Sequence, residues 1–162
     1  MHIRDALPGD LPAILDIYND VVLTTTAIYD QRPSTLEERR DWFESRRGQG
    51  LPVLVAESDG KVAGFSSFGD WRSRWGYRYT VEHSVHVHAD CRGQGIGRAL
   101  IEALFPIAAA LGKHVMIAHI DSQAIASRRV HEKLGFESVG IFRQVGRLAD
   151  GWLDLLAMQR NV

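Results

Sequence analysis

Residues 80–111 have the sequence TVEHSVHVHADCRGQGIGRALIEALFPIAAAL, which joins a β-like run, a glycine-rich loop and an apolar helical segment. A strand that leads into a glycine-rich turn at the start of a helix directs several backbone N–H groups, and the positive end of the helix, at one point. Glycines permit positive φ angles and let a ligand approach the backbone closely. We therefore predict an anion cradle in this loop, suited to a phosphate.

Two common nucleotide-binding motifs do not fit this loop. The dinucleotide fingerprint G-x-G-x-x-G needs a third glycine where Arg98 stands, and the Gly-Lys-Ser/Thr of a P-loop is absent. The pattern that remains is R-x-x-G-x-G, with Arg92, Gly95 and Gly97. The positive charges of Arg92 and Arg98 are unfavourable beside the positive end of the helix dipole unless an anion lies between the arginines and the helix. Their presence therefore favours a bound anion. The alternative is a flexible turn that binds nothing.

The composition narrows the class of protein. With 162 residues, 45% of them hydrophobic and 24% charged, the chain is expected to form one globular domain over residues 1–162. A net charge of -1 argues against a nucleic-acid partner. The single cysteine, Cys91, allows no internal disulfide and no cysteine-based zinc cluster. The charged N-terminal residues do not resemble a signal peptide and no apolar run is long enough to span a membrane, so we expect a cytoplasmic protein without a membrane partner.

Apolar residues at helical spacing predict four helices, over about residues 10–22, 34–48, 97–111 and 121–134. Asp10 is expected to cap the first helix, and Ser34 with Glu37 forms a capping-box pattern at the start of the second. Asp121 or Ser122 is expected to cap the fourth.

Seven strands are expected between and after these helices, at residues 3–5, 52–56, 61–68, 80–87, 114–120, 137–144 and 152–158. The sequence Leu134-Gly135-Phe136 predicts a Schellman-type stop after the fourth helix. The order β-α-α-β-β-β-α-β-α-β-β predicts an α/β sheet of mixed direction, because three strands follow one another before the glycine loop.

Residues 69–79, GDWRSRWGYRY, alternate aromatic and arginine side chains. Loops of this composition often bind ligands, since arginine matches carboxylates or phosphinates and aromatic rings form pocket walls. The alternative is a surface stack of arginines on aromatic rings, which is common.

Several stretches together carry a resemblance to a known family: IYNDVV, TTTAIYD, GDWR, TVEHSVHV, RGQGIG, HEKLGF and WLDLLAMQ. Their order resembles the GNAT superfamily of acetyl-CoA-dependent N-acetyltransferases, and most closely its phosphinothricin and methionine sulfoximine acetyltransferases. The resemblance implies a mixed, mostly antiparallel central sheet flanked by about four helices. It also implies acetyl-CoA as co-substrate, a small amino-acid-like substrate and a homodimer.

The resemblance also implies site residues. The backbone of Val85, His86 and Val87 would line the pantetheine arm and polarise the thioester. The pyrophosphate would be held by the loop residues Arg92, Gly93, Gln94, Gly95, Ile96, Gly97 and Arg98. The substrate pocket would fall on Arg72, Ser73, Arg74, Glu82, His83 and Ser84. The chain departs from the family twice, with Ala124 where many members have an asparagine that meets the cofactor, and His131 where many have a tyrosine as proton donor.

Acetyl transfer to an amine requires a base, a donor for the oxyanion and a leaving thiol. Glu82 is our candidate base, directly or through water, and the alternative is a carboxylate that faces solvent or pairs with an arginine. The oxyanion would be met by a backbone N–H near Val85. His131 is the candidate general acid, or else a packed helix histidine.

Three neighbouring histidines raise the possibility of a metal site. In a strand, His86 and His88 share a face with Glu82 and Ser84, whereas His83 points to the opposite face. Because only two of the histidines converge, we expect no metal.

We therefore expect N-acetylation of the α-amino group of a phosphinothricin, methionine sulfoximine or methionine sulfone type of amino acid, by direct attack. The expected role is herbicide or antibiotic resistance. The alternatives are a GNAT enzyme that acts on a protein N-terminus or an amino sugar, and a non-catalytic acyl-CoA-binding sensor.

Overall fold

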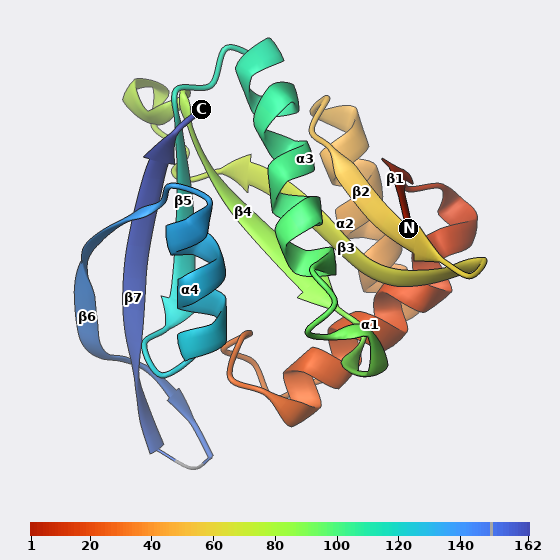
Figure 1. Ribbon diagram of the computed structural model, residues 1–162, viewed down its shortest axis with the longest axis horizontal. Coiled ribbons are helices and arrows are strands. Elements are labelled where there is room, and N and C mark those ends of the chain that lie inside the picture. Colours follow the sequence, from red (N-terminus) through yellow and green to blue (C-terminus); the bar gives the residue numbers. More distant parts are fainter. Residues whose placement is uncertain (150) are drawn as a thin grey trace.

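In the computed structural model, which describes residues 1–149 and 151–162, seven strands form one sheet with four α-helices on its two faces (Figure 1). The strands lie in the order β1-β2-β3-β4-β5-β7-β6. Their bounds are β1 His2–Asp5, β2 Val53–Ser58, β3 Lys61–Asp70, β4 Thr80–Val87, β5 Val115–Asp121, β6 Glu137–Leu148 and β7 Gly151–Asn161. The element order is the one that the sequence predicts.

The sheet is antiparallel except between β4 and β5, which run parallel. The expectation of a mixed, mostly antiparallel sheet with about four helices is therefore confirmed. None of the described helices is long and apolar enough to cross a membrane.

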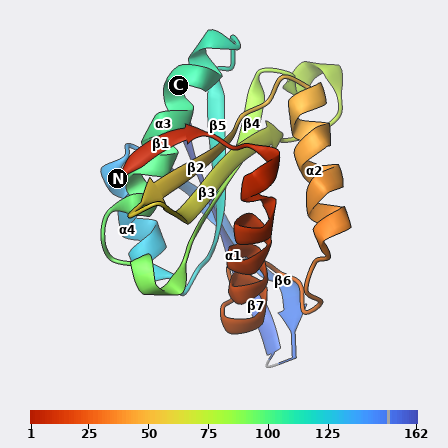
Figure 2. The same ribbon diagram turned by 90° about the vertical axis from the view of Figure 1, so that its right-hand side faces the viewer.

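The helices are divided between the two faces of the sheet (Figure 2). They span α1 Leu11–Thr24, α2 Leu36–Gly48, α3 Ile96–Ala110 and α4 Ile125–Lys133. Helices α1 and α2 pack on one face around Phe43 and Phe65, whereas α3 packs on the other face around Leu100 and Leu104. Each face thus has its own apolar core, and the sheet lies between the two.

The two parallel strands in the middle of the sheet are paired over a short stretch only and then diverge. Strands β4 and β5 pair only from Thr80 with Val115 to Glu82 with Ile117, although β4 continues to Val87 and β5 to Asp121. Over the rest of its length β4 stays paired with β3 on its other side, and β5 stays paired with β7. The facing edges of β4 and β5 therefore have backbone N–H and C=O groups that no neighbouring strand takes up.

The expected caps of three helices are wrong. Asp10 precedes α1, but its carboxylate makes no capping hydrogen bond to that helix; it accepts the Leu7 N–H and pairs with Arg4 instead. The capping box of α2 is formed by Thr35 and Glu38, one residue later than the expected pair, because the Thr35 hydroxyl accepts the Glu38 N–H and the Glu38 carboxylate accepts the Thr35 N–H. Helix α4 begins at Ile125 without a side-chain cap, since Asp121 belongs to the end of β5.

The ends of other elements also differ from the expectation. Helix α1 continues to Thr24, and β6 and β7 form a longer hairpin that extends beyond the rest of the sheet (Figure 1). The Schellman stop after α4 is confirmed: Gly135 has a φ of 81°, the Phe136 N–H donates to the His131 carbonyl, and the Gly135 N–H donates to the Glu132 carbonyl.

The core behind α3 offers a test of this packing. Leu104 is fully buried, whereas Leu23 near the end of α1 is 63% exposed. We expect Leu104→Ala to lower the free energy of unfolding by about 2–5 kcal/mol, because it removes buried apolar surface and leaves a cavity. Leu23→Ala should change it by less than about 1 kcal/mol. Urea unfolding checks both values, and equal losses would contradict the assignment of the core.

Candidate active site

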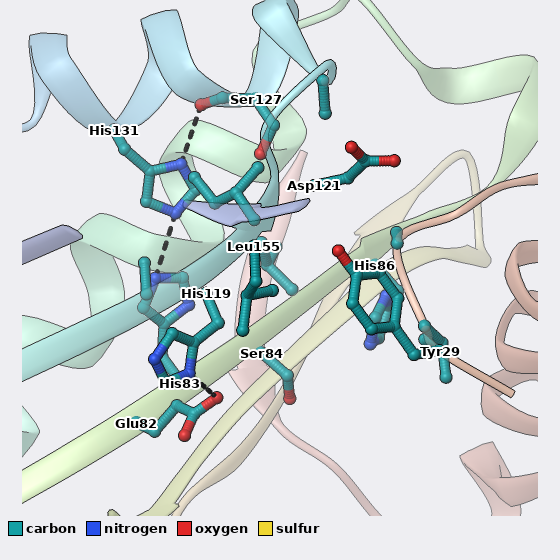
Figure 3. Close-up of a pocket in the computed structure, with 16 residues that line it drawn as sticks. Tyr29, Glu82, His83, Ser84, His86, His119, Asp121, Ser127, His131 and Leu155 are labelled. Carbon is teal, nitrogen blue, oxygen red and sulfur yellow. Dashed lines mark hydrogen bonds and ion pairs between the residues drawn. The ribbon is translucent and has the colours of Figure 1, made fainter. Parts of the chain in front are cut away.

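A cavity of about 280 Å³ lies where β4 and β5 separate (Figure 3). Its walls come from the loop after α1, from β4 and β5, from α4 and from Leu155 of β7. Six of the expected site residues line it: Glu82, His83, Ser84, Val85, His86 and His131.

Glu82 is held in this cavity by a histidine of the neighbouring strand. Its carboxylate accepts a hydrogen bond from His119 Nδ1 at 2.8 Å, and 38% of the Glu82 side chain is exposed. Among the described residues Glu82 pairs with no arginine. The partner of its carboxylate is His119 instead. Sequence reasoning missed His119. The parallel register, which pairs Glu82 with Ile117, two residues before His119, brings the two side chains together, and no local sequence pattern reveals that register.

His83 and His131 form a buried pair in the wall of the cavity. His131 Nδ1 must donate to the Ser127 carbonyl, at 2.8 Å, because that oxygen only accepts. In the neutral imidazole, His131 Nε2 then accepts, so the hydrogen of the 3.1 Å contact comes from His83 Nε2. His83 Nδ1 is left as an acceptor, and it is buried without a partner among the described residues.

Burial keeps both histidines neutral. It lowers the pKa of His83 to about 3, with a further contribution from the neighbouring His131. It also lowers the pKa of His131, against a smaller opposite effect from the Ser127 carbonyl. With both of its nitrogens engaged, His131 has no free proton directed into the cavity, an arrangement that favours the packed-histidine alternative over the general acid.

Two further side chains in the cavity region were not expected there. Tyr29, from the loop after α1, donates its hydroxyl to the Asp154 carbonyl at 3.3 Å. Burial and the charges of Asp121 and Asp154 raise the pKa of Tyr29. The Asp121 carboxylate accepts the Thr26 hydroxyl and so ties the same loop to β5. The segment TTTAIYD carried the resemblance, but its contact with β5 spans 95 residues of sequence and leaves no local pattern.

The glycine loop has the backbone expected of an anion cradle. Gly93 and Gly95 have φ angles of 78° and 81°, which favour glycine, and α3 begins without a side-chain cap on its N–H groups. The arginines, however, have partners of their own: Arg92 pairs with Asp20 at 2.9 Å and Arg98 with Glu102 at 3.1 Å. Carboxylates therefore balance both arginines without a bound anion, whereas the backbone geometry of the loop supports one.

The arginine-aromatic segment begins beside Glu82, because Gly69 pairs with Glu82 in the sheet, but its arginines do not line the Glu82 cavity within this chain. Arg72, Ser73, Arg74 and Tyr77 line a separate cavity of about 300 Å³ that shares no lining residue with the Glu82 cavity. Arg72 stacks over Trp71, with its guanidinium carbon 4.5 Å from the ring centroid.

The remaining candidates also have definite positions. His88 lies beyond the end of β4 and accepts the Asp90 N–H, so it does not share the strand face as expected. His83 and His86 do point to opposite faces, toward α4 and α1 respectively. Ala124 lines the cavity as the residue before α4 and offers no side-chain donor there. Among the residues described, no group of three or more His, Cys, Asp or Glu side chains is arranged to hold a metal ion.

The buried histidine pair predicts a pH dependence of stability. The folded-state pKa of His83, about 3, lies below its ordinary value of 6.5, so the unfolded chain takes up a proton first as the pH falls. The contribution of His83 to stability is therefore complete above pH 6.5 and is lost towards pH 3, with a loss of about 2 kcal/mol between pH 7 and 5. In urea unfolding at several pH values, His83→Leu should show a smaller loss, whereas the exposed His114→Leu should match the wild type. An unchanged slope in His83→Leu would contradict the buried neutral state.

The model of the acetyltransferase (GNAT) family matches residues 14–136. The L-methionine sulfoximine/L-methionine sulfone acetyltransferase of Pseudomonas aeruginosa is 51% identical over 161 residues, which cover 99% of this chain and 94% of that protein. The crystal structure of a ribosomal-protein-alanine N-acetyltransferase from Brucella melitensis has a TM-score of 0.98 at 44% identity and covers 100% of both chains.

A third similar protein is a GNAT superfamily phosphinothricin acetyltransferase from Sinorhizobium meliloti, whose structure was solved in complex with AcCoA. Its TM-score is 0.96 at 36% identity, with 99% of this chain and 88% of that chain covered. The resemblance seen in the sequence is thus confirmed. Since the family model matches most of the chain and these relatives align over nearly all of it, the chain belongs to the acetyltransferase (GNAT) family.

Proposed function

We propose that this protein transfers the acetyl group of acetyl-CoA to the α-amino group of a small amino-acid analogue of the phosphinothricin, methionine sulfoximine or methionine sulfone type. The observation that carries the proposal is the Glu82 carboxylate, fixed by His119 at the point where β4 and β5 separate. The names of the Pseudomonas aeruginosa and Sinorhizobium meliloti relatives support this substrate class. The proposal treats residues 1–162 as one acetyltransferase domain.

Acetyl-CoA would supply the acetyl group as a thioester, and the chain has features that fit its parts. The left-handed glycines and the uncapped N-terminus of α3 fit a pyrophosphate, so we assign it to residues 92–98. The free edge of β4 fits the amides of the pantetheine arm, which we assign to residues 85–87. Ala124 supplies no side-chain hydrogen bond to acetyl-CoA, so backbone groups supply a larger share of the cofactor contacts.

The chain's residues then perform three tasks. Glu82 takes a proton from the substrate ammonium, directly or through water, because only the neutral amine is nucleophilic. His119 orients that carboxylate through its Nδ1–H. The backbone N–H at Val85 donates to the oxygen on which negative charge develops.

The departing thiol needs little help. An ordinary thiol has a pKa of about 8.5, so a thiolate leaves readily near neutral pH. The role of His131 as general acid stays a prediction. For His131 to donate a proton into the cavity, its hydrogen bond with His83 would first have to rearrange.

We also propose a homodimer in which the second copy brings Arg72, Ser73 and Arg74 to the Glu82 cavity, where the arginines hold the acidic end of the substrate. Two observations support it. Within one chain these residues line a different cavity, and the edge strand β6 exposes a row of apolar side chains. These side chains are Val139, Ile141, Phe142 and Val145, each between 50% and 62% exposed. A cytoplasmic location and a role in resistance to herbicide-like or antibiotic amino acids belong to the same proposal.

A second candidate substrate is the N-terminal alanine of a protein, because the similar Brucella melitensis structure is described as a ribosomal-protein-alanine N-acetyltransferase. Two alternative functions remain to be separated from these: acetylation of an amino sugar, and acyl-CoA sensing without catalysis. An alanine-initiated peptide and glucosamine, offered beside L-methionine sulfone, separate the substrates, and turnover itself separates an enzyme from a sensor.

Replacement of the base tests the proposed chemistry. Glu82→Gln keeps an oxygen that accepts the His119 hydrogen but cannot take a proton, so kcat with L-phosphinothricin or L-methionine sulfone should fall at least about 100-fold. Acetyl-CoA binding should persist. Release of free CoA thiol measures turnover, and Glu44→Gln on the exposed surface of α2 is the matched control. Undiminished turnover in Glu82→Gln would remove Glu82 from the mechanism.

A mixing experiment tests the shared site. If Arg74 acts across a dimer, Arg74→Ala and Glu82→Gln are each inactive, but a mixed dimer contains one site with both native residues. Refolding the two variants together should then restore part of the CoA release. If both residues act within one chain, every site in the mixture is defective and the activity does not return.

A further inference from the structure

A second cavity adjoins the Glu82 cavity on the side of α1 and α2. This cavity, which we call the Arg39 cavity, has a volume of about 290 Å³ and shares Ile28, Ser84 and His86 with the Glu82 cavity. Its other lining residues are Tyr18, Arg39, Trp42 and Phe65. Figure 3 shows Ser84 and His86 along β4, with His86 on the opposite side of the view from His131.

Arg39 enters this cavity as a cation without a carboxylate partner. Its guanidinium carbon lies 4.1 Å from the ring centroid of Tyr18 and 5.2 Å from that of Trp42, and its Nε donates to the Ser34 hydroxyl at 3.1 Å. None of the ion pairs among residues 1–149 and 151–162 includes Arg39. The adjacent Glu38 pairs with Arg32 instead, at 2.8 Å. Partial burial lowers the pKa of Arg39, which reflects the cost of holding this charge away from water.

His86 provides a second, independent sign of a missing ligand. Its Nδ1 atom is buried and has no hydrogen-bond partner among the described residues. Its ring stands edge-on to Tyr18 and lies 5.2 Å from the Phe65 ring centroid. Burial and the charge of Arg39 lower its pKa to about 4, so near neutral pH it is an uncharged imidazole that can donate one hydrogen bond.

The charges of the two cavities are complementary to those of an amino acid. The Glu82 cavity contains the carboxylates of Glu82 and Asp121, whereas the Arg39 cavity has one guanidinium and no acidic lining residue. An amino acid has an ammonium group and at least one oxyanion. A cation between aromatic walls, beside further hydrogen-bond donors, matches the oxyanion.

We propose that the Arg39 cavity binds an oxyanion of the acceptor amino acid, either the α-carboxylate or a distal phosphinate, through Arg39, Ser84 and His86. This inference rests on the proposed function for the identity of the acceptor. It assigns a second anion site, in addition to the one that we propose for Arg72 and Arg74. An acceptor with two anionic groups, such as phosphinothricin, then has a cation for each.

Calorimetric binding to the purified full chain tests the inference without depending on turnover. The three ligands are L-phosphinothricin, with two oxyanions, L-methionine sulfone, whose only anion is its carboxylate, and 3-(methylsulfonyl)propylamine, which has none. The variants are Arg39→Met, Arg39→Lys and the control Arg40→Met, whose side chain is exposed on the same helix. Thermal melting confirms that each variant is folded, and Arg39→Lys keeps the charge if Arg39→Met proves unstable.

We expect Arg39→Met to raise the Kd for L-phosphinothricin about tenfold or more, Arg39→Lys to raise it less, and Arg40→Met to leave it unchanged. A similar loss for L-methionine sulfone would identify the α-carboxylate as the bound group. The Kd for the amine without a carboxylate should stay the same in all variants. A loss confined to L-phosphinothricin would identify the phosphinate as the bound group. An equal loss for all three ligands, no loss for any, or no binding to the wild type would overturn the inference.

The two proposals can fail separately. Binding that depends on Arg39, without acetylation of either amino acid, contradicts the proposed function and leaves the anion site in place. Acetylation with unchanged ligand binding and KM in Arg39→Met contradicts the anion site alone.

Discussion

The site depends on one constraint in the sheet: β4 and β5 pair over three residues and then separate. Each strand remains paired on its outer side, so the opening persists without unravelling the sheet. The opening leaves backbone groups of β4 free for an extended ligand and creates the space in which Glu82 meets His119. The glycine loop follows β4 after a short 3-10 turn at Ala89–Cys91, which brings the N-terminus of α3 to the same end of the opening.

The polar groups around the opening are arranged by charge. Neutral, buried histidines form one wall, where His83 and His131 bond to each other, and the Glu82 carboxylate lies beside them with part of its side chain exposed. Across β4, Arg39 stands between aromatic rings. A polar substrate with both charges can therefore meet an opposite charge for each.

Much of the fold follows from local sequence, and the parts that do not have identifiable causes. The element order and the stop at Gly135 were predicted because apolar periodicity and turn residues are local signals. The start of α2 was placed one residue early because Ser34 with Glu37 and Thr35 with Glu38 satisfy the same capping pattern, and only the hydrogen bonds choose between them. The start of α4 was wrong because Asp121 serves β5 and the loop after α1.

In the candidate site, too, the features with a local sequence signal could be predicted and the others could not. Glu82, His83 and Ser84 were placed together because they are consecutive in one strand. His119 and the pairing of His83 with His131, 48 residues away, depend on register and on the packing of α4, which leave no local trace. The partners of Arg92 and Arg98 were missed for a related reason: an isolated motif does not reveal which carboxylates the fold brings to it.

The central claim is that chemistry occurs at Glu82, in the opening between β4 and β5. The most direct measurement is a crystal structure of the protein with CoA and L-methionine sulfone. The account predicts the amine nitrogen within hydrogen-bond distance of the Glu82 carboxylate, or of a water bound to it, and the CoA arm along residues 85–87. A complex in which the amine lies away from Glu82, or in which the opening has closed by further pairing of β4 with β5, would contradict it.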